Sequence, residues 1–190
     1  MSYEECSQFE RKIAFHMAPS LLGIKCANLV SLSQKEFDIS EHLERFNRRV
    51  LAKGLKMKIL CSCNDRVLLL LYHEEKLLCH MKSESMLAIL QEYGYSESMS
   101  LDDMLYRLSE RICCHSEFPH EIGIFLGYPP DDVIGFIQNK GENYLLCGYW
   151  KVYSDKKRAE RIFKNYDKCR KFLCNKLNQG VDLYQALKIY

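Results

Sequence analysis

The sequence has no apolar run long enough to cross a membrane as a helix, which takes roughly 18 to 20 residues. Its longest uninterrupted apolar run covers residues 67–72, the length of a single β-strand. The first residues, MSYEECSQFERK, carry charges where a secretory signal peptide has an apolar segment. We therefore expect a cytoplasmic protein with no membrane partner.

Internal repeats, low-complexity tracts and linker-like stretches are also missing. The chain has 190 residues, of which 47% are hydrophobic and 27% charged. That composition is typical of folded globular proteins and not of disordered ones. This length suits one domain with a sizeable core, so we expect a single domain over residues 1–190.

The ten cysteines lack the spacing of a metal site. There is no pair of C-x-x-C motifs, and Cys113, Cys114 and His115 are consecutive, which is too tight for the spaced ligands of structural zinc. Their density is below that of a disulfide scaffold. We predict no metal site and reduced thiols that serve as small hydrophobic side chains. An iron–sulfur or redox role stays an open alternative.

Hydrophobic periodicity predicts an α+β fold. Residues 55–63 alternate apolar and polar side chains except at Leu60, the pair Asn64-Asp65 predicts a turn, and residues 67–72 read as a buried central strand. We therefore expect a hairpin over 55–72 within a small mixed or antiparallel sheet of about three to four strands, packed by several helices. Residues 21–31 and 144–153 are predicted to add strands, the former with a short helix as an alternative start.

Helices are expected on both sides of the hairpin. The helix over 3–17 is predicted to end at Ala18-Pro19, because proline disfavours helical geometry in the residue before it. Ser40 is the predicted N-cap of a helix that ends before Gly54. Further helices are predicted over 74–81, 84–93, from Ser100 onward, on either side of 128–130, over 155–178 and near the C-terminus.

The stretch FPHEIGIFLGYPPDDVIGF at 118–136 combines glycines, prolines and charges in an apolar run. Glycine in a helix costs up to about 1 kcal/mol relative to alanine, so Gly123 and Gly135 indicate close approach by another helix or by a ligand. We favour helix packing. The helix–turn–helix outline offers Asp131 and Asp132 where a DNA-reading helix has basic or amide side chains, so nucleic acid binding is disfavoured.

His120 and Glu121 are the titratable pair of this stretch. In the functional interpretation they are catalytic, with His120 as a general acid/base or a ligand. In the structural interpretation Glu121 is an acid favoured by a helix N-terminus and His120 is a satisfied polar residue. Neighbouring residues on a helix point about 100° apart, so the two need not act together.

Positive charge is concentrated in residues 151–176. This segment holds ten basic residues against three acids, a net charge of +7 in a chain of net charge +2. Five of the basic residues recur at helical spacing: Lys157, Arg161, Lys164, Lys168 and Lys171. We expect this basic helix face over 156–176 either to be merely solvated or to dock an acidic protein, an anionic cofactor or, with less support, nucleic acid.

Several segments resemble an uncharacterised bacterial family, the domain of unknown function numbered 3793. They are HMAPSLLGIKCANL at 16–29, FPHEIGIFLGYPPDDVIGFI at 118–137, GYWKVYSD at 148–155 and Tyr166-x-Lys168-Cys169. The resemblance covers nearly the whole chain and implies a bacterial, cytoplasmic protein without an established reaction. Family members typically begin H-C-A-P-T-L-x-G-x-K, so Met17 and Ser20 depart from the pattern. Met17 weakens the case for a thiol role beside His16.

The resemblance also implies a set of site residues of types that packing alone would not select. They are His120 and Glu121 as catalytic candidates, and His16, Lys25, Trp150, Lys151 and Tyr153 as ligand-binding candidates. We predict that they converge on one pocket for an anionic small molecule or a redox cofactor. Neither the cofactor nor an enzymatic activity is specified by the sequence.

Overall fold

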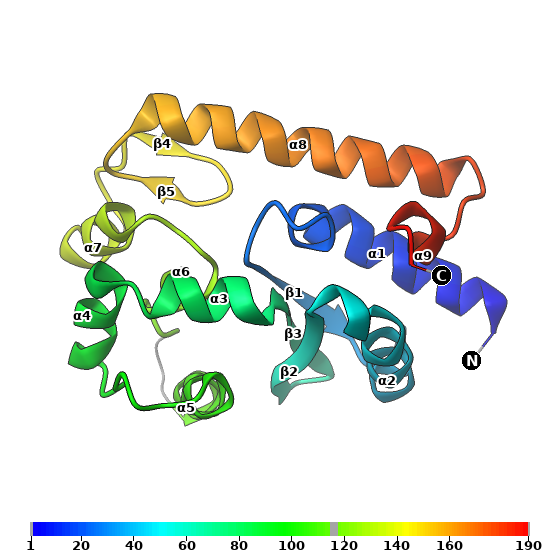
Figure 1. Ribbon diagram of the computed structural model, residues 1–190, viewed down its shortest axis with the longest axis horizontal. Coiled ribbons are helices and arrows are strands. Elements are labelled where there is room, and N and C mark those ends of the chain that lie inside the picture. The colour runs from blue at the N-terminus through cyan, green and yellow to red at the C-terminus, as the bar shows by residue number, and fades with distance from the viewer. Residues whose placement is uncertain (1, 115–117, 190) are drawn as a thin grey trace. The chain divides into compact units, whose positions relative to one another are not determined.

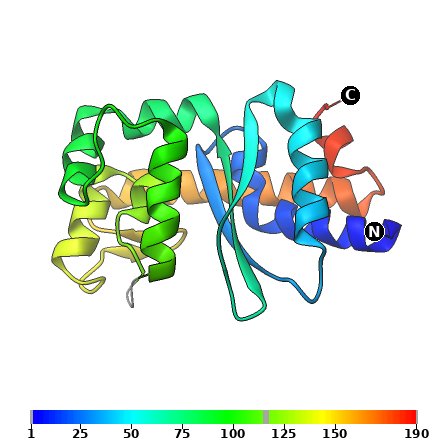
Figure 2. The same ribbon diagram turned by 90° about the horizontal axis from the view of Figure 1, so that it is seen from below.

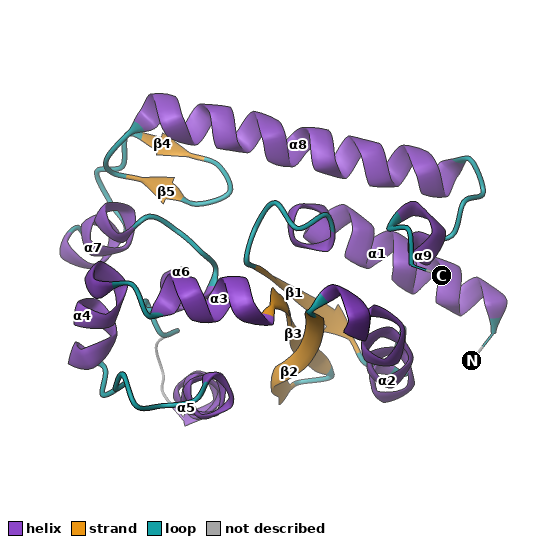
Figure 3. Cartoon of the chain, viewed as in Figure 1, coloured by secondary structure: helices purple, strands orange, loops and turns teal. Residues whose placement is uncertain are grey.

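The computed structural model describes residues 2–114 and 118–189, so the prediction that involves His115 lies outside the described residues. The α+β class is confirmed: helices accompany a three-stranded antiparallel sheet and a separate two-stranded one (Figure 3). The chain divides into two compact units, unit 1 from Met1–Glu75 and Tyr166–Tyr190 and unit 2 from Lys76–Asn165. They are described separately, and the single domain stays a prediction. Within the described ranges, no helix is both long and apolar enough to cross a membrane.

Unit 1 is built around a sheet of strand order β1-β3-β2. Its elements, labelled in Figure 1, are α1 (Tyr3–Leu21), β1 (Ala27–Ser33), α2 (Ile39–Val50), the short 3-10 helix η1 (Leu51–Lys53), β2 (Leu55–Cys63), β3 (Arg66–His73), the C-terminal part of α8 (Lys156–Asn178) and α9 (Leu183–Ala186). The predicted hairpin and its central strand are confirmed. Its turn is Asn64-Asp65, both with positive φ, and the hairpin runs beside α2 in Figure 2.

A β-bulge explains why Leu60 breaks the alternation of β2. The pairing register between β2 and β3 shifts between Ile59 and Cys61, so Leu60 is the extra residue. A bulge turns the following side chains to the opposite face of the sheet. Leu60 is itself buried, at 1% exposure.

The core of unit 1 joins both ends of the chain. One hydrophobic cluster combines residues of the sheet with residues of α1, α2, α9 and the C-terminal part of α8. It includes Ile13, Phe46 and Leu69 from the first part of the sequence and Leu173 and Leu183 from the last. Burying one such side chain stabilises the fold by about 1.5–3 kcal/mol. The C-terminal segment is therefore an integral part of this core.

Two predicted helix boundaries in unit 1 are wrong. Helix α1 continues through Pro19 to Leu21 and does not end at Ala18-Pro19. Proline here removes one backbone hydrogen bond, to the carbonyl of Phe15, and the whole last turn is buried, so packing offsets that loss. Helix α2 is capped by Asp38, whose side chain accepts from the Glu41 backbone N–H at 3.1 Å, and not by Ser40.

Unit 2 is mainly helical. It contains most of α3 (Glu74–Met81), α4 (Glu84–Glu92), α5 (Leu101–Cys114), α6 (Ile122–Phe125), α7 (Pro130–Gln138), β4 (Leu146–Cys147), β5 (Lys151–Val152) and the N-terminal part of α8. The strand predicted over 144–153 is wrong: the segment folds back as a short hairpin, in which Leu146 pairs with Val152. Gly148 lies in its turn, where a Cβ would collide with the Phe163 ring.

Candidate functional site

A pocket of about 880 Å³ lies within unit 2. This volume is in the range of small-molecule sites, roughly 300–1,000 Å³. The lining comes from the 118–136 stretch, the end of α7 and the β4–β5 hairpin: Phe118, Pro119, His120, Ile122, Gly123, Tyr128, Asp132, Val133, Phe136, Ile137, Lys140, Trp150 and Lys151. Two separate family segments, 118–137 and 148–155, therefore contribute to one pocket.

Aromatic rings form much of the pocket lining. Trp150 stacks on Tyr128 with ring centroids 5.1 Å apart and meets Phe163 edge-on at 4.6 Å. Burial raises the pKa of the Tyr128 phenol to about 12, and the phenol donates to the Tyr149 carbonyl at 3.2 Å. Phe136 adds a further ring on the lining. These rings offer flat apolar surface to a ligand.

Asp132 holds Trp150 and the hairpin in place. Its Oδ2 accepts from the Trp150 indole N–H at 2.7 Å, and its Oδ1 accepts from the Tyr153 and Ser154 backbone N–H groups and from the Ser154 hydroxyl. The carboxylate is buried, at 3% exposure. Because its carboxylate accepts hydrogen bonds from four donors, Asp132 fixes the position of the pocket wall.

Three side chains of basic type reach the pocket. Lys151 donates to the Gly141 carbonyl at 2.7 Å and lies 5.0 Å from the Tyr144 ring centroid, a cation–π contact. His120 is exposed, with its ring 5.3 Å from that of Phe136, and Lys140 is also exposed. His120 and Lys151, which the family resemblance implicates, thus line the same pocket.

Glu121 does not line this pocket although it follows His120. It is fully buried and forms an ion pair with the Arg111 guanidinium of α5. Its Oε2 atom has no hydrogen-bond partner among the described residues. Burial and the Glu121 charge raise the pKa of the neighbouring Tyr95. Glu121 therefore belongs to a buried polar cluster, and His120 is the member of the pair that a pocket ligand would meet.

The glycines of the stretch allow tight packing, as favoured from the sequence. A Cβ on Gly123 would lie 3.1 Å from Val133 of α7, and one on Gly135 would lie 2.5 Å from the Cβ of Tyr153. The second distance is shorter than any tolerated contact, so only glycine lets α7 approach Tyr153. Tyr153 is half-buried beside the pocket wall without lining the pocket.

His16 and Lys25, the other ligand-binding candidates, belong to unit 1. His16 is exposed on α1, and desolvation together with Lys12 and Arg170 lowers its pKa. Lys25 is buried, and its Nζ lies 5.8 Å from the centroid of the Tyr166 ring. Of the seven candidates, His120, Trp150 and Lys151 line the unit 2 pocket, whereas Glu121 and Tyr153 of the same unit do not.

The basic residues predicted on the long C-terminal helix all lie on α8 and are exposed. They are Lys157, Arg161, Lys164, Lys168 and Lys171. The opposite side of α8 carries the buried residues Ala159, Tyr166 and Leu173. Within 2–114 and 118–189, no group of three His, Cys, Asp or Glu side chains is arranged to hold a metal ion.

Three residues that line the pocket, Tyr128, Asp132 and Lys140, are not among the site residues predicted from the sequence. From the sequence, Asp132 serves only as an argument against DNA reading. Its hydrogen bond to Trp150, 18 residues away, leaves no local pattern in the sequence. Tyr128 sits in the Gly-Tyr-Pro-Pro turn, where its role was not distinguishable from that of a turn residue. The signal that could have found it is its place within the family segment at 118–137.

The fold and this pocket define an α+β protein with a candidate small-molecule site. The family described as “Protein of unknown function (DUF3793)” matches residues 13–187, so the chain belongs to that family and the resemblance is confirmed. Neither the search of curated proteins nor the search of solved structures found a match.

Proposed function

We propose that unit 2 binds a small organic anion with a flat apolar body in the pocket formed by His120, Trp150 and Lys151. The observation that supports this most is the pairing of a stacked aromatic wall with basic side chains in one cavity. Rings take up the apolar body of a ligand, and a few placed polar groups set its orientation. The proposal assigns binding and leaves a reaction unassigned.

The charge of the lining favours an anion over a cation. Lys140 and Lys151 are positive, whereas the carboxylate of Asp132 is already engaged by four donors. A carboxylate, sulfonate or phosphate would gain charge-assisted hydrogen bonds from the lysines. A planar redox cofactor with an anionic tail fits the same description.

The first experiment is purification without oxygen, followed by native mass spectrometry and an absorbance spectrum, which detect a retained ligand and a chromophore. Binding by the purified protein is then titrated with anilinonaphthalene sulfonate, an aromatic anion whose naphthalene ring is flat. We expect Lys151→Met to weaken its binding about tenfold, the loss of one charge-assisted contact. His120→Ala should weaken it as well.

Lys157→Met is the matched control, because Lys157 is exposed on α8 and does not line the pocket. It should bind the probe as the unaltered protein does. Thermal unfolding of every variant separates loss of binding from loss of folding. Equal probe affinity in Lys151→Met and Lys157→Met, with both folded, would contradict the proposal.

A second candidate function is docking of an acidic protein through the basic face of α8. The exposure of all five predicted basic side chains supports it. Binding of this kind weakens steeply with salt. Charge reversal at Arg161, Lys164 and Lys168 should abolish such an interaction without changing probe binding in the pocket. A gel shift at low salt tests whether nucleic acid binds the same face.

A further inference from the structure

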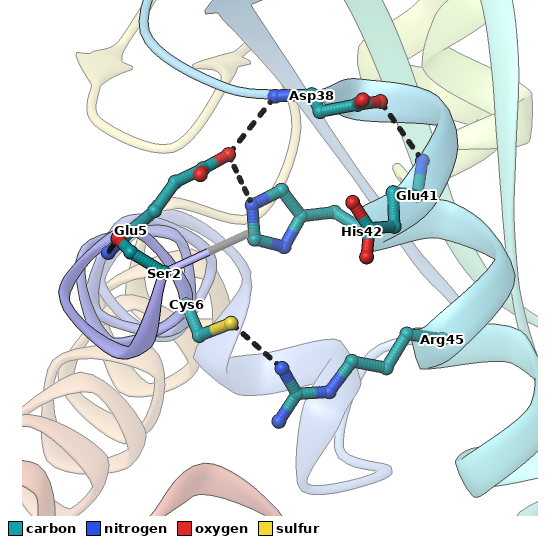
Figure 4. A network of polar contacts seen from close by, with 7 residues as sticks. All are labelled: Ser2, Glu5, Cys6, Asp38, Glu41, His42 and Arg45. Atoms are coloured by element: carbon teal, nitrogen blue, oxygen red, sulfur yellow. Dashed lines mark hydrogen bonds and ion pairs between the residues drawn. The ribbon is translucent and has the colours of Figure 1, made fainter.

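In unit 1, helix α2 turns a row of polar side chains toward the start of α1. His42, Arg45 and Arg49 follow one another at three- and four-residue spacing, which places them on one helix face. Figure 4 shows Glu5 and Cys6 of α1 opposite His42 and Arg45: Glu5 pairs with the imidazole at 3.4 Å, and the Arg45 guanidinium donates to the Cys6 sulfur at 2.7 Å.

This face continues into a second pocket, of about 430 Å³, which lies entirely within unit 1. Arg11, Arg45 and Arg49 line it, together with Glu10 and Asp182. Guanidinium groups thus outnumber carboxylates around the cavity. The volume exceeds what a bare ion needs and lies in the range of small ligands.

The charged side chains around this pocket differ in how strongly they already interact with other parts of unit 1. Arg11 donates to the Asn178 side chain at 2.6 Å and to the Leu177 carbonyl at 3.1 Å, so it caps the end of α8. Glu10 accepts from the Leu183 N–H, and Asp182 accepts from the Gln185 N–H as the cap of α9. These three side chains are therefore already engaged in hydrogen bonds within unit 1.

The guanidinium groups of Arg45 and Arg49 make weaker contacts with carboxylates and carbonyl groups of unit 1. The ion pair of Arg45 with Glu10 is long, at 3.9 Å, and its side chain is 33% exposed. The Arg49 guanidinium lies over the face of the Tyr184 ring, 3.9 Å from its centroid. Like charges one helical turn apart repel. An anion between them would remove that repulsion.

We propose that Arg45 and Arg49 form an oxyanion site of unit 1, which takes the carboxylate or phosphate group of a small molecule. Each guanidinium presents a planar fork of N–H donors that matches two oxygens of such a group. Stacking on Tyr184 holds the Arg49 fork in a fixed plane, so less side-chain entropy is lost on binding. The site shares no residue with the unit 2 pocket, and each can fail without the other.

The test is calorimetric titration of the full-length protein with sodium phosphate and, separately, with sodium succinate, at constant ionic strength set by sodium chloride. The anion that binds more tightly identifies the favoured group. Arg49→Gln should weaken binding at least about tenfold, the loss of a bidentate charged contact. Arg49→Lys keeps the positive charge but lacks the planar fork of N–H donors. Its affinity for the anion should therefore lie between that of the unaltered protein and that of Arg49→Gln.

Arg48→Gln is the matched control, because Arg48 is the exposed neighbour on α2 and does not line the pocket. It should bind as the unaltered protein does. Equal weakening in Arg48→Gln and Arg49→Gln, or no binding of either anion at millimolar concentration, would overturn the proposal. Arg49→Lys keeps the test valid if Arg49→Gln fails to fold.

Alkylation of Cys6 locates the bound anion. Cys6 lines the same pocket, whereas Cys63 is exposed at the end of β2. The bound anion should slow the reaction of Cys6 with iodoacetamide, measured by peptide mass, and leave Cys63 unchanged. Binding without protection of Cys6 would place the anion elsewhere and refute the assignment.

Discussion

At the scale of single residues, Lys25 brings a positive charge into the interior of unit 1. Its side chain is 5% exposed, and its ammonium lies 5.8 Å from the Tyr166 ring centroid. Burial lowers its pKa from 10.5 to about 8, although the neighbouring Cys26 acts in the opposite direction. A cation–π contact offsets only part of such a desolvation cost. The charged form of Lys25 therefore carries a desolvation cost at neutral pH.

The pH dependence of stability should reveal this cost. Below pH 8 both the folded and the unfolded state hold the Lys25 proton, and the penalty is fully present. Between pH 8 and 10.5 the folded state releases the proton while the unfolded state keeps it, so the free energy of unfolding rises with pH. A shift of this size corresponds to about 3 kcal/mol.

We expect Lys25→Met to remove this rise, so that its stability advantage over the unaltered protein shrinks from neutral to alkaline pH. Urea unfolding at a series of pH values measures the difference. Lys53→Met changes an exposed lysine of the same unit and should leave the rise intact. A parallel pH profile for Lys25→Met would show that the lysine is not desolvated.

At the scale of elements, the β4–β5 hairpin depends on one carboxylate of α7. Asp132 joins the helix to Trp150 and to the chain after β5 through four hydrogen bonds. The hairpin has only two residues in each strand, and so short a hairpin is not stable alone. The position of Trp150, and with it the pocket wall, therefore follows from Asp132.

Asp132→Asn should destabilise unit 2 by about 2 kcal/mol, because the amide presents a donor to groups that are themselves donors and leaves one of them unsatisfied. Asp131→Asn makes the same charge change on an exposed neighbour and should be close to neutral. Trp150 is the only tryptophan, so guanidinium unfolding followed by its fluorescence reports on this hairpin directly. Equal midpoints for the two variants would refute the anchoring role.

Local patterns predicted the elements well where the signal is itself local. The alternation in 55–63 and the turn at Asn64-Asp65 identified the hairpin, and even its irregular residue, Leu60, coincides with the bulge. Patterns failed where tertiary packing overrides propensity, as at Pro19, whose helical turn is buried. They also failed at 144–153, where an apolar segment folds back on itself.

The candidate site was accessible from the sequence only in part. The family segments contain His120, Trp150 and Lys151, which line one pocket. The separation of His120 from Glu121 depends on Arg111, ten residues away on another helix. A contact between two separate elements produces no periodic pattern or fixed spacing in the sequence. The different surroundings of His120 and Glu121 therefore become visible only in the tertiary structure.

At the scale of the whole molecule, the family match extends over both compact units. The match covers residues 13–187 and thus spans both units. Unit 1 draws its core from two distant parts of the sequence, with Cys169, Leu173 and Leu177 of α8 packed among residues of α1, α2 and the sheet. Helix α8 therefore has two distinct sides, one buried and the other exposed and basic.

Substitutions on adjacent positions of α8 should separate these two sides. Leu173 is fully buried in unit 1, whereas Phe172 beside it is 45% exposed. Leu173→Ala should lower the free energy of unfolding by about 2–5 kcal/mol through loss of burial and creation of a cavity. Phe172→Ala should cost less than about 1 kcal/mol. Thermal unfolding followed by circular dichroism measures both, and similar losses would contradict the assignment of Leu173 to the core.

The interrupted make-up of unit 1 has a consequence for the order of folding during synthesis. A nascent chain emerges from the ribosome N-terminus first, and a segment can pack only after it has emerged. Residues 76–165 of unit 2 are all available before Cys169, Leu173 and Leu183 appear. While unit 2 is being synthesised, the apolar side chains of unit 1 that pack against α8 and α9 therefore stay uncovered. Chaperones that hold exposed apolar segments would meet this protein at that stage.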